Sequence, residues 1–146
     1  MVKKLTLGQK RELIKLLSAK SVTNLIYKSG HIILNFDGRR LRYKVIMKHE
    51  PSIANWSRVR KEIHYDEKLG KRDILPVLVH EAVEKYVTQK YHLNTDKESH
   101  KIAQRVEKKF ISDACSRRFE NKCRHTGRCW RLHESRIERI WNKGKK

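Results

Sequence analysis

The sequence predicts an α+β fold with an N-terminal helix, an antiparallel β-meander with an edge strand, two packed helices and a small C-terminal module. Residues 32–47 alternate between apolar and polar side chains around a turn dipeptide, whereas two stretches between residues 73 and 114 repeat their apolar side chains with helical spacing. All three cysteines follow these stretches. We therefore expect an α+β domain over residues 1–112 and a separate module over residues 113–146.

The first helix and the hairpin carry local signals where they begin or turn. Thr6, with Gln9 three residues later, is typical of a capping box at the start of a helix. The Asp-Gly dipeptide at positions 37–38 favours the two-residue turn of a hairpin. Such a turn sets a register in which Leu34 faces Leu41, so that the apolar side chains of both strands share one face of the sheet.

The remaining elements are predicted from the same periodicities. Residues 22–28 precede a Ser-Gly turn and extend the hairpin to a meander, and residues 51–56 are expected to form a connection. Residues 59–65 carry many charges, which favours a strand at the edge of the sheet. Helices are predicted over residues 73–91 and 94–114.

The charge balance indicates a polyanionic partner. Lys and Arg total 36 against 16 Asp and Glu, which gives a net charge of +20 at pH 7, and such an excess is typical of proteins that bind nucleic acid. No long uncharged apolar run predicts a membrane span. The charged N-terminal stretch lacks the apolar segment of a signal peptide, so we expect an intracellular, cytoplasmic protein associated with DNA or RNA.

Acidic and imidazole side chains lie on the apolar faces of both predicted helices. His80 and Glu84 are one turn apart on the apolar stripe of the first helix, and His100 and Glu107 share the stripe of the second. If the helices pack antiparallel, His80, Glu84 and His100 converge as ligands of zinc with an open position, and Glu107 accepts a ring N–H behind them. Glu81, at the border of the stripe, is then the candidate base that deprotonates a metal-bound water. The alternative is that these are buried hydrogen-bonded pairs that serve packing alone.

The stretch from Ile63 to Phe110, with its HEAVE sequence and a later histidine, resembles the zincin-like domains found in small proteins of archaea and their mobile elements. In that pattern a strand at the sheet edge precedes the helix that bears the motif. The resemblance implies that His80 binds zinc, that Glu81 is the general base of peptide hydrolysis and that His100 is the third ligand. Glu84 stands where zincin peptidases have their second histidine.

The C-terminal module contains a second set of candidate ligands. Cys115, Cys123, Cys129 and His133 are separated by seven, five and three residues, and three thiolates with one imidazole complete a tetrahedral zinc site. His125 is a competing ligand with a less suitable spacing. The spacing resembles the CCCH zinc finger, whose members commonly bind single-stranded RNA. The sequence thus predicts one structural zinc in the tail and a second zinc at the His–Glu cluster.

The tail also has the composition of a nucleic-acid-binding segment. Basic and aromatic residues interleave there, which suits phosphate contact combined with base stacking. The candidates are Arg117, Arg118, Phe119, Arg124, Arg128, Trp130 and Arg131. The alternative is a structural zinc knuckle that only anchors the tail, with Trp130 packed inward.

Two functions follow from these patterns. The first is a nucleic-acid-associated zinc protein with a metallopeptidase domain, for which a protein bound to DNA or RNA is the substrate. The second is a non-catalytic nucleic-acid-binding protein, such as a regulator or a component of a ribonucleoprotein or virion, in which zinc is structural. Two-metal nuclease chemistry is disfavoured because the sequence lacks the clustered carboxylates that it needs.

Overall fold

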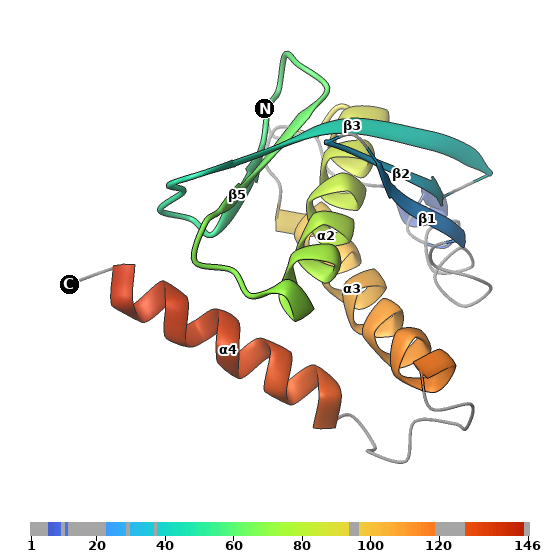
Figure 1. The fold of residues 1–146 in the computed structure, drawn as a ribbon. Coiled ribbons are helices and arrows are strands. Elements are labelled where there is room, and N and C mark those ends of the chain that lie inside the picture. The colour runs from blue at the N-terminus through green and yellow to red at the C-terminus, as the bar shows by residue number, and fades with distance from the viewer. Residues whose placement is uncertain are drawn as a thin grey trace.

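The computed structural model of the protein describes residues 6–9, 11, 23–28, 30–36, 38–93, 97–118 and 128–144. These residues form an α+β fold in which a mixed sheet carries its long helices on one side (Figure 1). The named elements are β1 (Thr23–Lys28), β2 (His31–Phe36), β3 (Arg39–Lys48), β4 (Ala54–Trp56), β5 (Glu62–Asp66), α2 (Lys71–Lys90), α3 (Lys97–Arg118) and α4 (Arg128–Gly144). The predicted α+β class is therefore confirmed.

The antiparallel meander has the predicted register. The sheet order is β1-β2-β3-β5-β4, and Leu34 pairs with Leu41 across the hairpin. Gly38 has a φ of 66°, which is the left-handed conformation that a glycine adopts without strain. The side chains at 32, 34 and 36 are buried together with those at 41, 43 and 45, so one face of the hairpin faces the core as the alternation requires.

The position of the fifth strand differs from the prediction. Strand β5 lies inside the sheet, because it pairs in parallel with β3 and antiparallel with β4. The edge is formed by β4, from the segment that the sequence predicts to be a connection. Val59, expected in the strand, precedes it and is 91% exposed. Charge alone gave the wrong edge because Ile63 and Tyr65 bury one face of β5 while its charged residues lie on the other or at its ends.

The start of the predicted N-terminal helix has the capping box. The backbone N–H of Thr6 donates to Oε1 of Gln9 at 2.9 Å, and the backbone N–H of Gln9 donates to Oγ1 of Thr6 at 3.2 Å. Residues 7–9 and 11 are helical. The rest of that predicted helix lies outside the described residues.

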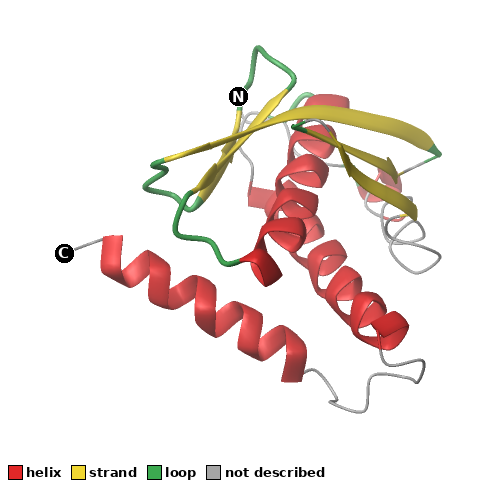
Figure 2. Ribbon diagram, viewed as in Figure 1, coloured by secondary structure: helices red, strands yellow, loops and turns green. Residues whose placement is uncertain are grey.

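Helix α2 is the central element of the fold and is buried on nearly all sides. Figure 2 shows it between the sheet and the other helices, and its side chains at 78, 79, 82, 83 and 87 are inaccessible to solvent. Lys85 and Thr88, which the helical periodicity assigns to a polar face, are each only 2% exposed. Thr88 bonds to Ser99 of α3 at 2.6 Å, and the Lys85 ammonium donates to the backbone carbonyl of Ser57. A polar stripe on this helix thus contacts protein rather than solvent.

The C-terminal part differs from the predicted separate module. Helix α3 begins at Lys97 and runs to Arg118, so it crosses the predicted boundary between residues 112 and 113. Helix α4 then packs back against α3, and its side chains also reach α2. None of the described helices is long and apolar enough to cross a membrane.

Candidate functional site

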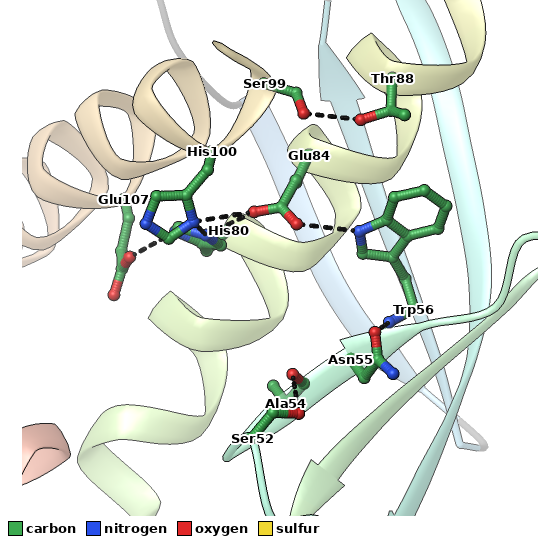
Figure 3. Close-up of polar contacts among 10 residues, drawn as sticks. All are labelled: Ser52, Ala54, Asn55, Trp56, His80, Glu84, Thr88, Ser99, His100 and Glu107. Atoms are coloured by element: carbon green, nitrogen blue, oxygen red, sulfur yellow. Dashed lines mark hydrogen bonds and ion pairs between the residues drawn. The ribbon is translucent and has the colours of Figure 1, made fainter. Parts of the chain in front are cut away.

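Two helices bring three potential metal ligands to one point. Helix α2 supplies His80 and Glu84, one turn apart, and α3 supplies His100 from the opposite side (Figure 3). Nε2 of His80 lies 3.0 Å from Oε2 of Glu84 and 3.1 Å from Nδ1 of His100, and that nitrogen lies 3.0 Å from the same Glu84 oxygen. Among the described residues these side chains form the group whose ligand atoms converge closely enough to hold a metal ion.

The triangle of donor atoms fits a cation better than it fits hydrogen bonds. Two imidazole nitrogens and one carboxylate oxygen make three mutual contacts, but they carry at most two hydrogens, one on each nitrogen. On one edge of the triangle, therefore, two hydrogen-bond donors or two acceptors always face each other. A tetrahedral zinc ion at ordinary bond lengths holds its ligand atoms about 3.3 Å apart, which is close to the observed separations. The chemistry of the donors, two nitrogens and one oxygen, also suits zinc.

Two neighbouring side chains fix the orientation of these ligands. Nδ1 of His80 lies 2.8 Å from Oε1 of Glu107, the carboxylate that the sequence places behind the cluster. This bond favours the hydrogen on Nδ1 and directs Nε2 at the cluster. Nε1–H of Trp56 donates to Oε1 of Glu84 at 3.1 Å, which leaves Oε2 for the two imidazoles.

The charges of the cluster's side chains are coupled to one another. Burial acts to raise the pKa of Glu84, but hydrogen bonds from His80 and Trp56 lower it to about 2. Burial likewise acts to lower the pKa of His80, but its bonds to Glu107 and Glu84 raise it to about 10. At neutral pH the His80 cation is therefore held between two ionised carboxylates, those of Glu84 and Glu107.

The cluster lies beside a cleft of about 460 Å³ between β4, α2, α3 and α4. The place of His100 on the apolar stripe predicts a buried side chain, but this side chain is 55% exposed and lines the cleft. Glu81 is 9% exposed and also lines the cleft, next to the candidate ligands. Helix α4 and the segment that leads into the edge strand form the other walls. The residues that they contribute are Ser52, Ile53, Ala54, Trp130, His133, Glu134, Ile137, Glu138 and Trp141. The arrangement combines a candidate metal centre with room for a substrate.

The structure places His133 in this site and not in a tail zinc site. Nδ1 of His133 lies 2.8 Å from Oδ1 of Asp73, and its Nε2 lies 2.5 Å from Oε2 of Glu107. Both ring nitrogens of His133 therefore contact carboxylates, and the predicted role of His133 as the fourth ligand of a CCCH site stays a prediction. Cys129 lies on the first turn of α4 and is partly buried. Cys123 and the side chain of Cys115 lie outside the described residues.

The predicted nucleic-acid contacts of the tail are described only in part. Arg128 and Arg131 are exposed on α4, whereas Trp130 is half-buried, lines the cleft and lies with its ring centroid 5.6 Å from that of His133. Trp130 thus lies on the wall of the cleft beside His133. Phe119, Arg124 and the side chains of Arg117 and Arg118 lie outside the described residues.

Three residues of the site are not predicted from the sequence. Trp56 lies in a predicted connection, Asp73 begins a predicted helix, and Arg136 is one of many basic residues in the tail. The guanidinium of Arg136 donates to both oxygens of Asp73, at 2.9 Å from Nε to Oδ2 and 2.8 Å from Nη2 to Oδ1. For Arg136 the sequence offers one local signal, its place three residues after His133 on an amphipathic stretch. That pattern is too common to identify a site residue.

No family model, curated protein or solved structure matches this chain. The chemistry of the site is therefore argued from its own side chains and their geometry.

Proposed function

We propose that the protein is a metal-dependent hydrolase of the zincin type, and that zinc held by His80, Glu84 and His100 serves the hydrolysis of a peptide bond in the adjoining cleft. The observation that carries the proposal is the triangle of donor atoms, 3.0–3.1 Å on each edge, beside a cleft of about 460 Å³. Zinc in such a site supplies a Lewis acid and lowers the pKa of a bound water.

The chain's own residues have distinct roles in this proposal. Glu107 orients the ring of His80, and Trp56 holds the Glu84 carboxylate so that one oxygen faces the two imidazoles. Glu81 follows a ligand directly in the sequence and lines the same cleft, which supports a role of its carboxylate as the base that takes the proton of the attacking water and returns it to the leaving amine. Ser52, Ile53 and Ala54, where the chain enters the edge strand β4, add the wall along which we expect an extended substrate to bind.

The test compares metal content and cleavage in matched variants. We expect the full chain to bind zinc and to cleave an unstructured protein substrate such as casein. His100→Ala is expected to lower the zinc content of the protein. Glu81→Gln is expected to retain zinc but lose about 100-fold or more of the cleavage rate, because the general base is removed. Glu67→Gln, an exposed carboxylate on the turn after β5, is the matched control and should cleave normally. Equal zinc content in the protein and its His100→Ala variant would refute the metal centre, and normal cleavage by Glu81→Gln would refute the mechanism.

We also propose that the protein binds nucleic acid through the outer face of its sheet. Arg40, Arg42 and Lys44 are exposed on alternate positions of β3, opposite the buried side chains that face the helices. Three cations spaced along one strand, on a chain of net charge +20, suit the phosphates of a nucleic-acid backbone.

This second proposal is tested by the salt dependence of binding to single- and double-stranded oligonucleotides. Replacing the three cations together by Glu should weaken binding and reduce the slope of log affinity against log salt by about two to three, because each phosphate contact contributes close to one unit. Glu81→Gln should bind as the unmodified protein does. Affinity that is unchanged by the triple replacement would remove this face from the interface.

A further inference from the structure

A continuous series of buried hydrogen bonds joins helix α4 to the candidate metal ligand His80. Glu107 contacts His80 through Oε1 at 2.8 Å and His133 through Oε2 at 2.5 Å. His133 in turn contacts Asp73 at 2.8 Å, and Asp73 is held by the guanidinium of Arg136. Helices α2, α3 and α4 all contribute to this series, and it ends at the nitrogen opposite the donor triangle.

His133 is the most deeply buried of the described side chains of α4. It is 2% exposed, whereas its neighbour Leu132 is 46% exposed and Trp141 at the other end of the helix is 39% exposed. If docking of α4 were its only role, an apolar side chain of similar volume would serve as well or better, because a buried imidazole between two carboxylates carries a desolvation penalty. A histidine has two ring nitrogens that bond in fixed directions, so its presence indicates that the orientation of its two carboxylate partners matters here.

The bonds of His133 fix the orientation of the Glu107 carboxylate. A carboxylate that is bonded at one oxygen alone can rotate about its side-chain torsions, whereas Glu107 is bonded at both oxygens by two rings that approach from different helices. His133 thereby sets the plane of the Glu107 carboxylate, and Glu107 sets the orientation of the His80 ring. Partners of this kind behind a ligand commonly contribute about 10- to 100-fold in metal affinity.

We propose that His133 is a positioning residue of the metal centre, which acts through the Glu107 carboxylate to hold His80 with its Nε2 toward Glu84 and His100. In this proposal helix α4 contributes a functional residue to the metal centre. This inference rests on the proposed function, because it assumes that the donor triangle binds a metal ion. It adds that the affinity for this ion depends on a side chain that touches neither the ion nor the substrate.

Two substitutions at one position separate the two bonds of the ring. In His133→Gln the amide nitrogen reaches the place of Nε2, so a donor to Glu107 is retained while the contact with Asp73 is lost. In His133→Asn the amide reaches only the place of Nδ1, so the contact with Asp73 is retained and the donor to Glu107 is lost. The two variants are similar in polarity, and they differ in the one bond that the inference requires.

The experiment measures Co²⁺ affinity by competition with a chromophoric chelator, together with the visible spectrum of bound Co²⁺. All proteins are full-length and carry Cys123→Ser, so that cysteine ligation in the tail does not contribute to the spectrum. We expect His133→Asn to weaken Co²⁺ binding about 10- to 100-fold and to alter the spectrum, and His133→Gln to stay within about threefold of the parent. Leu132→Ala, an exposed neighbour on α4, should leave both readouts unchanged.

Each outcome decides between distinct conclusions. A parent that binds no Co²⁺ would overturn the proposed function, and this inference with it. A parent that binds Co²⁺ as tightly as both His133 variants do would leave the metal centre standing and overturn the positioning role. Loss of affinity in both variants in proportion to their loss of unfolding free energy would also overturn it, since that is the result of a purely structural contact. If His133→Asn does not fold, Arg136→Gln tests the same series from its partly exposed end and should weaken Co²⁺ binding in the same direction by a smaller factor.

Discussion

The bond between Trp56 and Glu84 offers a quantitative test of the site that needs no metal. The indole N–H donates to a carboxylate whose pKa is held at about 2, so the acceptor is ionised at neutral pH. Both side chains are buried, with exposures of 7% and 5%. A hydrogen bond to a buried charged group contributes about 1.5–3 kcal/mol to stability, and solvent screening is slight here. We therefore expect a coupling free energy of about 2 kcal/mol between the two residues.

The perturbation is a double-mutant cycle with Trp56→Phe and Glu84→Met, measured by urea unfolding of the chelator-treated protein at pH 7. Trp56→Phe alone should cost about 2–4 kcal/mol, because it removes the bond and also leaves a cavity. Once Glu84 is already replaced by Met, the same substitution should cost about 2 kcal/mol less. Trp141→Phe, at an exposed position, is the matched indole-to-phenyl control and should cost about 1 kcal/mol or less.

A coupling below about 0.5 kcal/mol would refute the reasoning, because it would mean that Trp56 does not hold the carboxylate and only fills space. The orientation of Glu84 toward the two imidazoles would then need another cause. A coupling of the expected size would show that the carboxylate is fixed before any metal ion binds, as pre-organisation of the site requires.

Two further predictions concern the stability of the metal-free protein. Leu34→Ala should reduce the free energy of unfolding, measured in urea, by about 2–5 kcal/mol, because this side chain is fully buried in the core. Leu7→Ala, at a residue 66% exposed, should change it by no more than about 0.5 kcal/mol. Burial acts to lower the pKa of His133, but bonds to Glu107 and Asp73 raise it above the ordinary 6.5. Burial acts to raise the pKa of Asp73, but bonds from Arg136 and His133 lower it below 3.8. The contribution of His133 to stability should therefore be greatest between about pH 4 and 6.5. The stability difference between the protein and His133→Gln should therefore shrink as pH rises from 6.5 through the raised pKa of the ring; a difference that grows over this range would contradict the assignment.

The parts of the fold that the sequence predicts are those fixed by local rules. The capping box at Thr6 and the two-residue hairpin turn depend on a few neighbouring residues, and both are present in the structure. The register of Leu34 with Leu41 follows from the turn alone. Helical periodicity likewise places His80 and Glu84 on one face, because that relation is internal to a single helix.

The parts that could not be predicted depend on which elements meet. Insertion of β5 between β3 and β4 is a non-local pairing with no signal in the strand itself. Lys85 has a polar position on the helical wheel, but burial arises because the loop before β5 covers it with the carbonyl of Ser57. Asp73 and His133 are 60 residues apart in the sequence and meet only when α4 docks.

The case of His133 also changes what is expected of the tail. If Cys115, Cys123 and Cys129 bind zinc in this structure, their fourth ligand is not His133, because both of its ring nitrogens bond to carboxylates. His125 is the other imidazole of this segment, and it lies between two of the cysteines. We therefore expect His125→Ala to lower the zinc content by about one ion per chain, as Cys123→Ser does, while His133→Gln leaves the tail zinc in place. The opposite pattern, with loss on His133→Gln and none on His125→Ala, would mean that the tail binds zinc through the CCCH spacing and that α4 must leave the cleft to do so, since one imidazole cannot bridge Asp73 to Glu107 and ligate the tail zinc as well.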